Sequence, residues 1–378
     1  MTNGTRIGEI MKNTHVRTAG LLIVGALAVV AASCGSTAST KSATSAAGTA
    51  TTVASASSAG STAPAASTGG TTPAASATTA AAATGAAGAP ITLAVNPWTG
   101  SAVNANIAKV ILESKLNTKV TLQAIDENAT WPGMDSGAID AVLEVWPSGH
   151  TADVATYIDE KKSVADIGLL GPNAKIGWYV PTAMLKTHPE LATWEGFKSK
   201  DTSKLFATAE SGDLGQFLMG DPSYVSYDEQ IIKNLNLPLK FVVAGSEAAL
   251  ITAIQQAVKD NTPLLMQFWQ PHWLQSQVAL TQVKLPDVTD ACLASAKAAD
   301  GKYACDYPVD HLFKAASVKL QTKNPAAWKF LSKISLTTDQ QNAIAAMIDG
   351  KGKQGMTPAD AATAWVAANP DIVAGWLS

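Results

Sequence analysis

From residue 91 onward, short apolar segments typical of strands alternate with segments typical of helices. We expect strands at residues 91–95, 120–124, 141–145, 176–180 and 263–269, and helices at 101–116, 151–162, 247–259 and in pieces from 324 to the end. Such alternation predicts an α/β fold of mainly parallel sheets flanked by helices. Because residues 91–378 exceed the usual size of a single core, two lobes are expected.

The first 34 residues have the layout of an export signal. Arg6, Lys12 and Arg17 precede an apolar run at 19–32, which is too short for a permanent membrane span. The run ends at Ala31-Ala32-Ser33-Cys34, which resembles the bacterial lipobox, so residues 1–34 are expected to be a lipoprotein signal peptide with Cys34 lipidated. Ordinary signal-peptidase cleavage nearby is the alternative, and Met11 is an alternative start.

Residues 35–89 consist almost entirely of Ala, Ser, Thr, Gly and Pro. Such a composition buries too little apolar surface to offset the entropy of ordering, so a disordered linker is expected. A flexible coil of this length spans on the order of 40 Å. The folded part is therefore expected at residues 90–378.

Cysteine usage agrees with export. Apart from Cys34, the chain contains Cys292 and Cys305 alone. Two cysteines in an exported chain predict a disulfide. Closing this loop should stabilise the fold by about 3 kcal/mol in the chain-entropy model.

Charge and motifs exclude several function classes. The formal net charge is -3, and without a basic run nucleic acid is not an expected partner. Residues 350–355 match G-x-G-x-x-G, but they follow a helical segment rather than a strand, so we interpret them as a loop between helices. The chain lacks G-x-S-x-G, H-E-x-x-H and a P-loop. We expect no enzyme activity, no cofactor and no metal.

Tryptophan is the informative residue type. The chain has 10 Trp against 7 Phe and 6 Tyr, and Trp98, Trp146 and Trp269 each lie close to the end of an expected strand. In open α/β sheets, ligands bind beyond the carboxyl ends of the strands. Indole faces attract quaternary ammonium groups. These three tryptophans therefore predict a site for such a cation.

Four segments make the chain similar to a known family. NPWTG at 96–100, EVWPSGH at 144–150, FWQPHW at 268–273 and the pattern MTPADAATAWVAANPDIVAGWL at 356–377 resemble the substrate-binding proteins of ABC importers for glycine betaine, proline betaine and choline. The resemblance implies a two-lobed type II periplasmic-binding-protein fold with the ligand in the cleft. The expected lobes are about 90–180 with 280–378, and about 181–279. It also implies permease subunits as partners and a lipid-anchored location at the outer face of the cytoplasmic membrane.

The same resemblance assigns roles to individual residues. Trp146 and Trp269 would be walls of an aromatic box, Trp98 a third wall, and His150 a hydrogen-bond donor to a ligand carboxylate. Relatives take a further aromatic from the second lobe; Tyr224 is the expected substitute here, and Trp178 or Tyr179 is the alternative.

Other interpretations stay open at several of these positions. His150 is an equally good cap for the helix near Thr151, and His272 is an alternative carboxylate donor. Gly100 and Ser101 begin a helix whose free amides favour an anion. Any of the acidic residues Asp213, Asp221 and Asp228 in the cleft would repel a betaine carboxylate and suit choline. The alternative function is an exported envelope lipoprotein or a hydrolase acting on a small polar substrate.

Overall fold

The apolar runs expected to be strands are strands in the computed structural model, which describes residues 88–298, 300–349 and 355–378. The strands are β1 (Gly88–Val95), β2 (Thr118–Ala124), β3 (Ala141–Val145), β4 (Val164–Pro181), β5 (Gly215–Met219), β6 (Leu239–Val243), β7 (Met266–Gln270), β8 (Leu280–Val283) and β9 (Asp310–Ser317).

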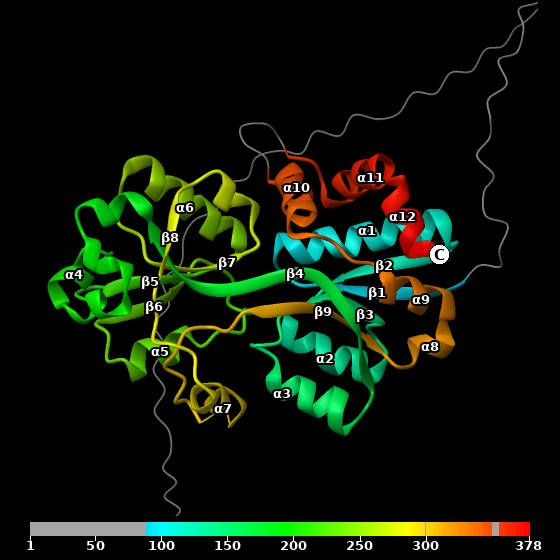
Figure 1. Cartoon of the computed structure of the whole chain (residues 1–378), viewed down its shortest axis with the longest axis horizontal. Helices are drawn as coiled ribbons and strands as arrows, with labels where there is room; N and C mark the ends of the chain where they lie inside the picture. Colours follow the sequence, from blue (N-terminus) through cyan, green and yellow to red (C-terminus); the bar gives the residue numbers. More distant parts are fainter. Residues whose placement is uncertain (1–87, 299, 350–354) are drawn as a thin grey trace, which may run out of the picture. The chain divides into compact units, whose positions relative to one another are not determined.

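One long strand joins two groups of strands. The order is β2-β1-β3-β9-β4-β7-β5-β6, and β8 also pairs with β4. Residues 164–174 of β4 pair with β9, whereas residues 175–181 pair with β7 and β8, all antiparallel. We call the strands on either side of this change the first half-sheet (β2, β1, β3, β9) and the second half-sheet (β7, β8, β5, β6). Figure 1 shows β4 running between them.

Each half-sheet contains the parallel pairing that the sequence predicts. β1 pairs in parallel with β2 and β3, and β5 pairs in parallel with β6 and β7. The pairings next to the connection between the halves are antiparallel. β9, which comes late in the sequence, pairs antiparallel with both β3 and β4. The α/β class is confirmed, and the antiparallel strands are an addition to the expected parallel order.

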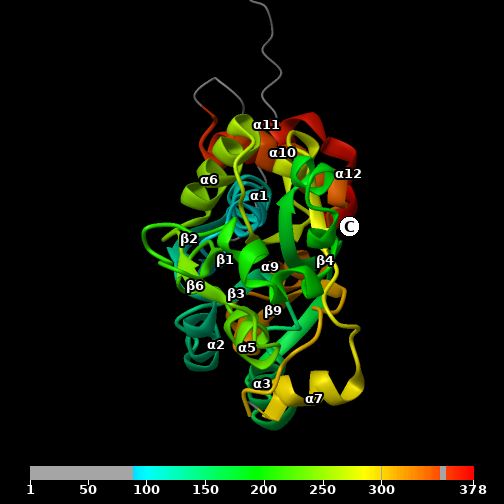
Figure 2. The ribbon, with the colours of Figure 1, turned by 90° about the vertical axis from the view of Figure 1, so that its left-hand side faces the viewer.

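The helices lie on both faces of the strands. They are α1 (Thr99–Lys115), α2 (Glu127–Ser136), α3 (Thr151–Asp153), α4 (Lys200–Lys204), α5 (Asp228–Asn234), α6 (Glu247–Asp260), α7 (Asp290–Ala298), α8 (Leu320–Lys323), α9 (Pro325–Lys333), α10 (Thr338–Ile348), α11 (Pro358–Ala368) and α12 (Pro370–Leu377). α3 continues as a π-helical turn, η1 (Val154–Glu160), and 3₁₀ turns lie at η2 (Thr182–Lys186), η3 (Pro189–Ala192), η4 (Trp194–Lys198) and η5 (Trp273–Ser276). Figure 2 shows α1, α10 and α11 on one side of β1 and β3, with α2 and α3 on the other.

The buried residues divide less simply than the expected lobes. One core includes Leu93 and Ile107 of the first half together with Leu250 of α6. A second core collects Phe217 and other residues of the second half, and it extends along the chain from Val283 to Tyr307. Residues 283–298 and 300–307 thus pack with the second half, although the expected boundary at 280 assigned them to the first lobe. The reason is local: Tyr303 stacks on Tyr227 at 4.3 Å between ring centroids.

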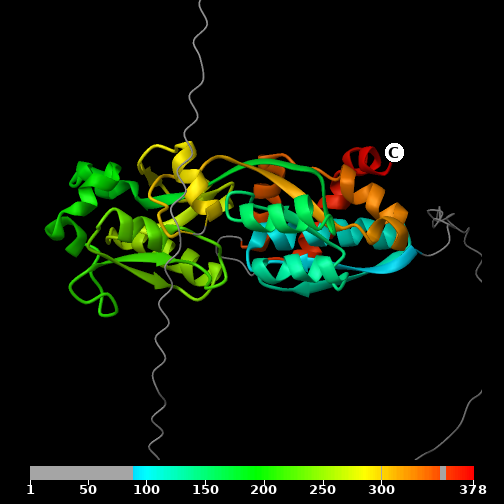
Figure 3. The same cartoon turned by 90° about the horizontal axis from the view of Figure 1, so that it is seen from below.

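The same segment contains the cysteine pair. Cys292 and Cys305 form a disulfide, with sulfur atoms 2.06 Å apart. Cys292 is in α7, the yellow helix near the middle of Figure 3, and it packs against the second core. Cys305 is buried in the second core. The disulfide therefore ties α7 to the core beneath it.

Several expectations concern residues outside the described part of the chain. These are the signal peptide at 1–34 with Cys34, the linker up to residue 87, and most of the loop at 350–355. β1 begins at Gly88, two residues inside the expected linker. Among the helices of the described residues, none combines the length and the apolar character needed to cross a bilayer.

Candidate functional site

A cavity lies where the two half-sheets meet. The space between its lining atoms, counted together with the part open to solvent, is about 450 Å³. Its lining comes from both halves of the fold: Trp98, Glu127, Trp146, Gly149, Ile176, Tyr224, Val225, Gln267 and Trp269. The lining is thus dominated by aromatic rings.

The structure brings together the four aromatic residues expected to form the walls. Trp98 lies between β1 and α1, Trp146 directly follows β3, and Trp269 is the fourth residue of β7. Tyr224, from the loop between β5 and α5, packs edge-on against Trp98 at 6.0 Å and against Trp269 at 5.6 Å. The Tyr224 hydroxyl donates to the carbonyl of Pro97 across the two halves, at 3.1 Å. Four aromatic side chains therefore surround one space.

Glu144 holds two of these rings from behind. Its Oε1 accepts hydrogen bonds from the indole N–H groups of Trp98 at 2.8 Å and Trp146 at 3.0 Å. Its Oε2 accepts from the side-chain amides of Asn104 at 2.6 Å and Gln341 at 2.8 Å. Burial raises the pKa of Glu144 to about 7, against the opposing effect of these donors. The carboxylate fixes both indoles by their N–H edges, and both side chains line the cavity.

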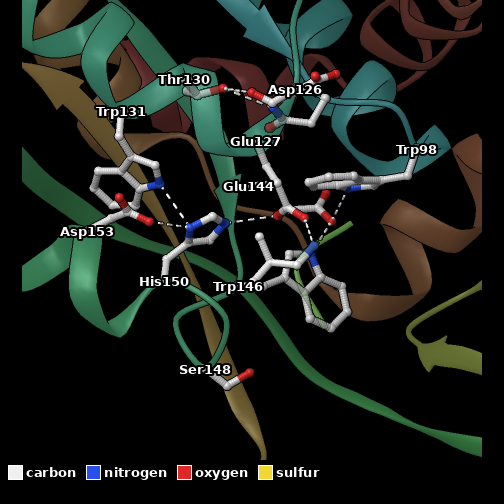
Figure 4. A network of polar contacts seen from close by, with 12 residues as sticks. Trp98, Asp126, Glu127, Thr130, Trp131, Glu144, Trp146, Ser148, His150 and Asp153 are labelled. Carbon is white, nitrogen blue, oxygen red and sulfur yellow. Dashed lines mark hydrogen bonds and ion pairs between the residues drawn. The ribbon is translucent and has the colours of Figure 1, made fainter. Parts of the chain in front are cut away.

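A second carboxylate, Glu127, lies in the cavity wall itself. Glu127 is the first residue of α2, and its Oε1 accepts the backbone N–H of Val225 from the other half of the fold. Its Oε2 is 2.9 Å from Nε2 of His150. Nδ1 of His150 is in turn 2.9 Å from Oδ2 of Asp153. Figure 4 shows this chain of contacts beside the Glu144 cluster.

His150 is best described as an imidazolium between two carboxylates. Burial alone would lower its pKa, but the hydrogen bonds to Asp153 and Glu127 outweigh burial and raise the pKa to about 9. The Trp131 indole N–H also lies 3.1 Å from Nδ1, and it can donate there only when that nitrogen carries no proton. With two flanking carboxylates, we assign the proton to Nδ1 and the hydrogen bond to Asp153. The group of Glu127, His150 and Asp153 then carries one net negative charge.

The structure does not bring His150 to the cavity as a ligand donor. Both of its ring nitrogens are occupied, and the side chain is buried behind Glu127. His272 is also engaged elsewhere: the Leu274 N–H donates to its Nδ1, so Nε2 carries the proton and donates to Glu247 at 3.1 Å. Neither histidine lines the cavity, and both are hydrogen-bonded to acidic side chains of the protein.

The expected anion site at the start of α1 is also filled by the protein. The Ser101 hydroxyl accepts the Asn96 N–H at 2.9 Å and closes the turn. A Cβ at Gly100 would lie 2.8 Å from the Glu144 carboxylate, so the glycine allows α1 to approach that group. The free amide at Thr99 binds Glu247 at 2.7 Å. Gly100 and Ser101 therefore have structural roles outside the cavity.

Trp178 belongs to the second core rather than to the aromatic walls. It is fully buried, and its indole N–H donates to Asp228 at 2.7 Å. Burial raises the pKa of Asp228 to about 6. Neither Asp228, Asp213 nor Asp221 lines the cavity. Among the described residues, the acidic group in the wall is Glu127 instead.

Sequence reasoning missed Glu127 and Glu144, although a signal existed for each. Glu127 follows the carboxyl end of the expected strand 120–124, the position that singled out the tryptophans. It went unnoticed because Pro132 and Gly133 obscure the helical pattern of α2. Glu144 is a charge inside the otherwise apolar strand AVLEV, and a buried charge must have partners.

The family match covers most of the described fold. Residues 89–368 match the family described as the substrate-binding domain of an ABC-type glycine betaine transport system. The chain belongs to this family. It is accordingly a substrate-binding receptor of an ABC importer of this family.

Individual relatives are more distant. The chain is 27% identical to the trimethylamine N-oxide-binding protein of Pelagibacter ubique, over 75% of this chain and 89% of the relative. The solved structure of lactococcal OpuAC with glycine betaine is 21% identical, with a TM-score of 0.59 over 77% of this chain and 100% of that one. A choline-binding protein with choline bound is 18% identical, with a TM-score of 0.60 over 76% and 91%. These structures share the two-lobed type II fold, which confirms the expected class.

Proposed function

We propose that this protein is an extracytoplasmic receptor that captures a small quaternary ammonium solute and delivers it to the permease of an ABC importer. The expected ligands are glycine betaine, proline betaine or choline. The observation that carries the proposal is the enclosure of one cavity by Trp98, Trp146, Tyr224 and Trp269. Indole and phenol faces attract a desolvated methylammonium group by about 2 kcal/mol or more.

The arrangement of the walls supports this use. Trp98, Trp146 and Trp269 are 7 to 8% exposed, so a cation between them would be largely removed from water. Glu144 engages two of the indoles by their N–H edges and adds negative charge behind them. Relatives named for trimethylamine N-oxide, glycine betaine and choline all take methylated ammonium compounds, which supports the same ligand chemistry here.

The location belongs to the same proposal. The receptor would be held at the outer face of the cytoplasmic membrane by a lipid on Cys34, with residues 35–87 as the tether. Metabolic labelling with a lipid precursor tests this attachment, and unlabelled mature protein would contradict it.

The test of ligand class uses a charged ligand and its neutral twin. Choline and 3,3-dimethyl-1-butanol share shape and hydroxyl, but the second has carbon in place of the cationic nitrogen. Isothermal titration should show at least tenfold tighter binding of choline, since about 1.4 kcal/mol corresponds to one decade. Glycine betaine and its neutral-headed twin 3,3-dimethylbutanoate form a second pair.

Substitutions locate the effect at the cavity. Trp146→Leu and Trp269→Leu should each remove most of the preference for the cation, because they keep an apolar wall without the negative ring face. Trp194→Leu, far along the chain in η4, is the matched control and should preserve it. Equal binding of the charged and neutral twins to the unmodified protein would overturn the proposed function.

A further inference from the structure

Glu127 is the charged group in the cavity wall. Among the described residues that line the cavity, none is a lysine or an arginine. The only arginines of the whole chain are Arg6 and Arg17. A ligand carboxylate in this cavity would therefore face Glu127 without a lining cation to compensate it.

Several donors around the cavity are already committed within the protein, although the indole N–H of the lining residue Trp269 is not among them. The N–H of Gly149 donates to the carbonyl of Trp146, and the N–H of Val225 donates to Glu127. The Tyr224 hydroxyl donates to Pro97, and the Gln267 amide donates to Asp228. A ligand that needs several donors would have to break these bonds, whereas a ligand that donates finds Glu127 in place.

The charged residues around Tyr224 give this part of the cavity a negative electrostatic potential. Its pKa is raised first by burial and then by the negative charges of Glu247, Asp221, Glu127 and Glu144. His150 balances one charge of the group that it forms with Glu127 and Asp153, which leaves that group negative. A low-dielectric cavity with this field favours a ligand of net positive charge over a zwitterion with its own carboxylate.

We propose that Glu127 determines the ligand's polar end: the receptor takes methylated ammonium cations whose polar end presents an O–H to the Glu127 carboxylate, and it disfavours betaines that end in a carboxylate. This inference rests on the proposed function. Choline presents such a hydroxyl directly. An N-oxide presents one after it takes a proton from solvent on its oxygen, which gives a hydroxyammonium cation and changes no bond to carbon.

His150 has a positioning role in this selection. It holds Oε2 of Glu127, while Val225 holds Oε1, so the carboxylate is fixed in the wall from both halves of the fold. Glu127 also lines a smaller buried space behind the cavity, together with Glu144 and His150. The carboxylate thus stands between the aromatic box and the polar cluster behind it.

The first experiment measures ligand preference by calorimetry on the full chain. The probes are choline, trimethylamine N-oxide, glycine betaine and tetramethylammonium, which has no oxygen. Choline should bind at least tenfold more tightly than glycine betaine. If the N-oxide binds, its heat should change with buffer in the way that uptake of about one proton requires, and its affinity should fall as pH rises; choline should show neither effect.

Substitutions then separate polar-end selection from the box itself. Glu127→Gln should weaken choline by about tenfold while weakening glycine betaine little or strengthening it, so that the preference collapses. Glu229→Gln, the same change on an exposed residue of α5, should alter neither affinity. Glu144→Gln should weaken every methylammonium probe by a similar factor, because Glu144 acts through the indoles.

The outcomes distinguish this inference from the proposed function. If no probe binds the unmodified protein, the proposed function fails. If glycine betaine binds the unmodified protein as tightly as choline, the selection by Glu127 fails while the receptor function stands. The same conclusion follows if Glu127→Gln leaves the ratio of the choline and glycine betaine affinities unchanged. Binding of the N-oxide without proton uptake would likewise overturn the hydrogen bond to Glu127. If Glu127→Gln does not fold, the preference of the unmodified protein for choline over glycine betaine still tests the inference.

Discussion

At the scale of single residues, the site depends on buried ionised groups with defined partners. Glu144 accepts four hydrogen bonds, all from neutral donors, and His150 lies between Glu127 and Asp153. Such groups tie affinity and stability to pH, because a proton held differently in the folded and unfolded chain changes the free energy of unfolding.

We predict that the free energy of unfolding of the ligand-free protein falls as pH rises from about 4.5 to about 9. The folded pKa of Glu144 is about 7 against 4.5 ordinarily, so its proton stabilises the folded state below pH 4.5 and this contribution is lost as pH rises through 7. The folded pKa of His150 is about 9 against 6.5, so its contribution is complete below pH 6.5 and is lost as pH rises through 9.

Urea unfolding at closely spaced pH values measures this dependence. Glu144→Gln should reduce the slope between pH 4.5 and 7, to which Asp228 with its pKa of about 6 also contributes, and His150→Gln should reduce the slope between 6.5 and 9. A His150→Gln protein that keeps the upper slope would show that His150 is not the group responsible.

At the scale of elements, the sequence predicts the regular strands and helices well and the irregular ones poorly. The strand 141–145 has the predicted bounds, and α1 and α6 agree to within two residues. β4 extends over 18 residues, although only 176–180 was expected, because its first part, interrupted by Gly168, Gly171 and Pro172, pairs with β9 from the far end of the chain. The sequence did not predict α2, because Pro132 in its interior argues against a helix.

At this scale we predict that the Cys292–Cys305 disulfide forms in the exported protein and stabilises it by about 3 kcal/mol, the loop-closure value. Alkylation without reductant followed by intact-mass analysis should find both thiols blocked. The double variant Cys292→Ser/Cys305→Ser should unfold at correspondingly lower urea concentration. Reductant should destabilise the unmodified protein and leave the double variant unchanged; two alkylated thiols in the mature protein would disprove the pairing.

At the scale of the whole described fold, side chains from the two halves meet around the cavity. Thr99, at the start of α1, donates through its N–H and its hydroxyl to Glu247 at the start of α6, both at 2.7 Å. The Tyr227 hydroxyl donates to the carbonyl of Ser148 at 3.1 Å. These contacts stabilise the arrangement in which the cavity is enclosed.

We predict that Thr99→Val accelerates ligand dissociation about tenfold and changes association little. The substitution removes one hydrogen bond to a charged group, worth about 1.5 to 3 kcal/mol, and keeps the backbone N–H. Stopped-flow measurement of choline release gives the rate. Thr252→Val, on the exposed side of α6, is the matched control. Unchanged release from Thr99→Val would show that this contact does not hold the halves together.

The sequence by itself determined the α/β class and the three tryptophans that meet at one cavity, because hydrophobic periodicity is local and strands of one sheet end at a common edge, whereas Tyr224 was expected only from the family resemblance. Only the tertiary structure decided which polar groups face that cavity. Glu144 meets Gln341 across 197 positions and Glu127 meets Val225 across 98. The sequence left His150 open between capping a helix and binding a ligand, and folding places Glu127 and Asp153 against it. Buried charges take the nearest partners that the fold supplies, and no local pattern encodes such partners.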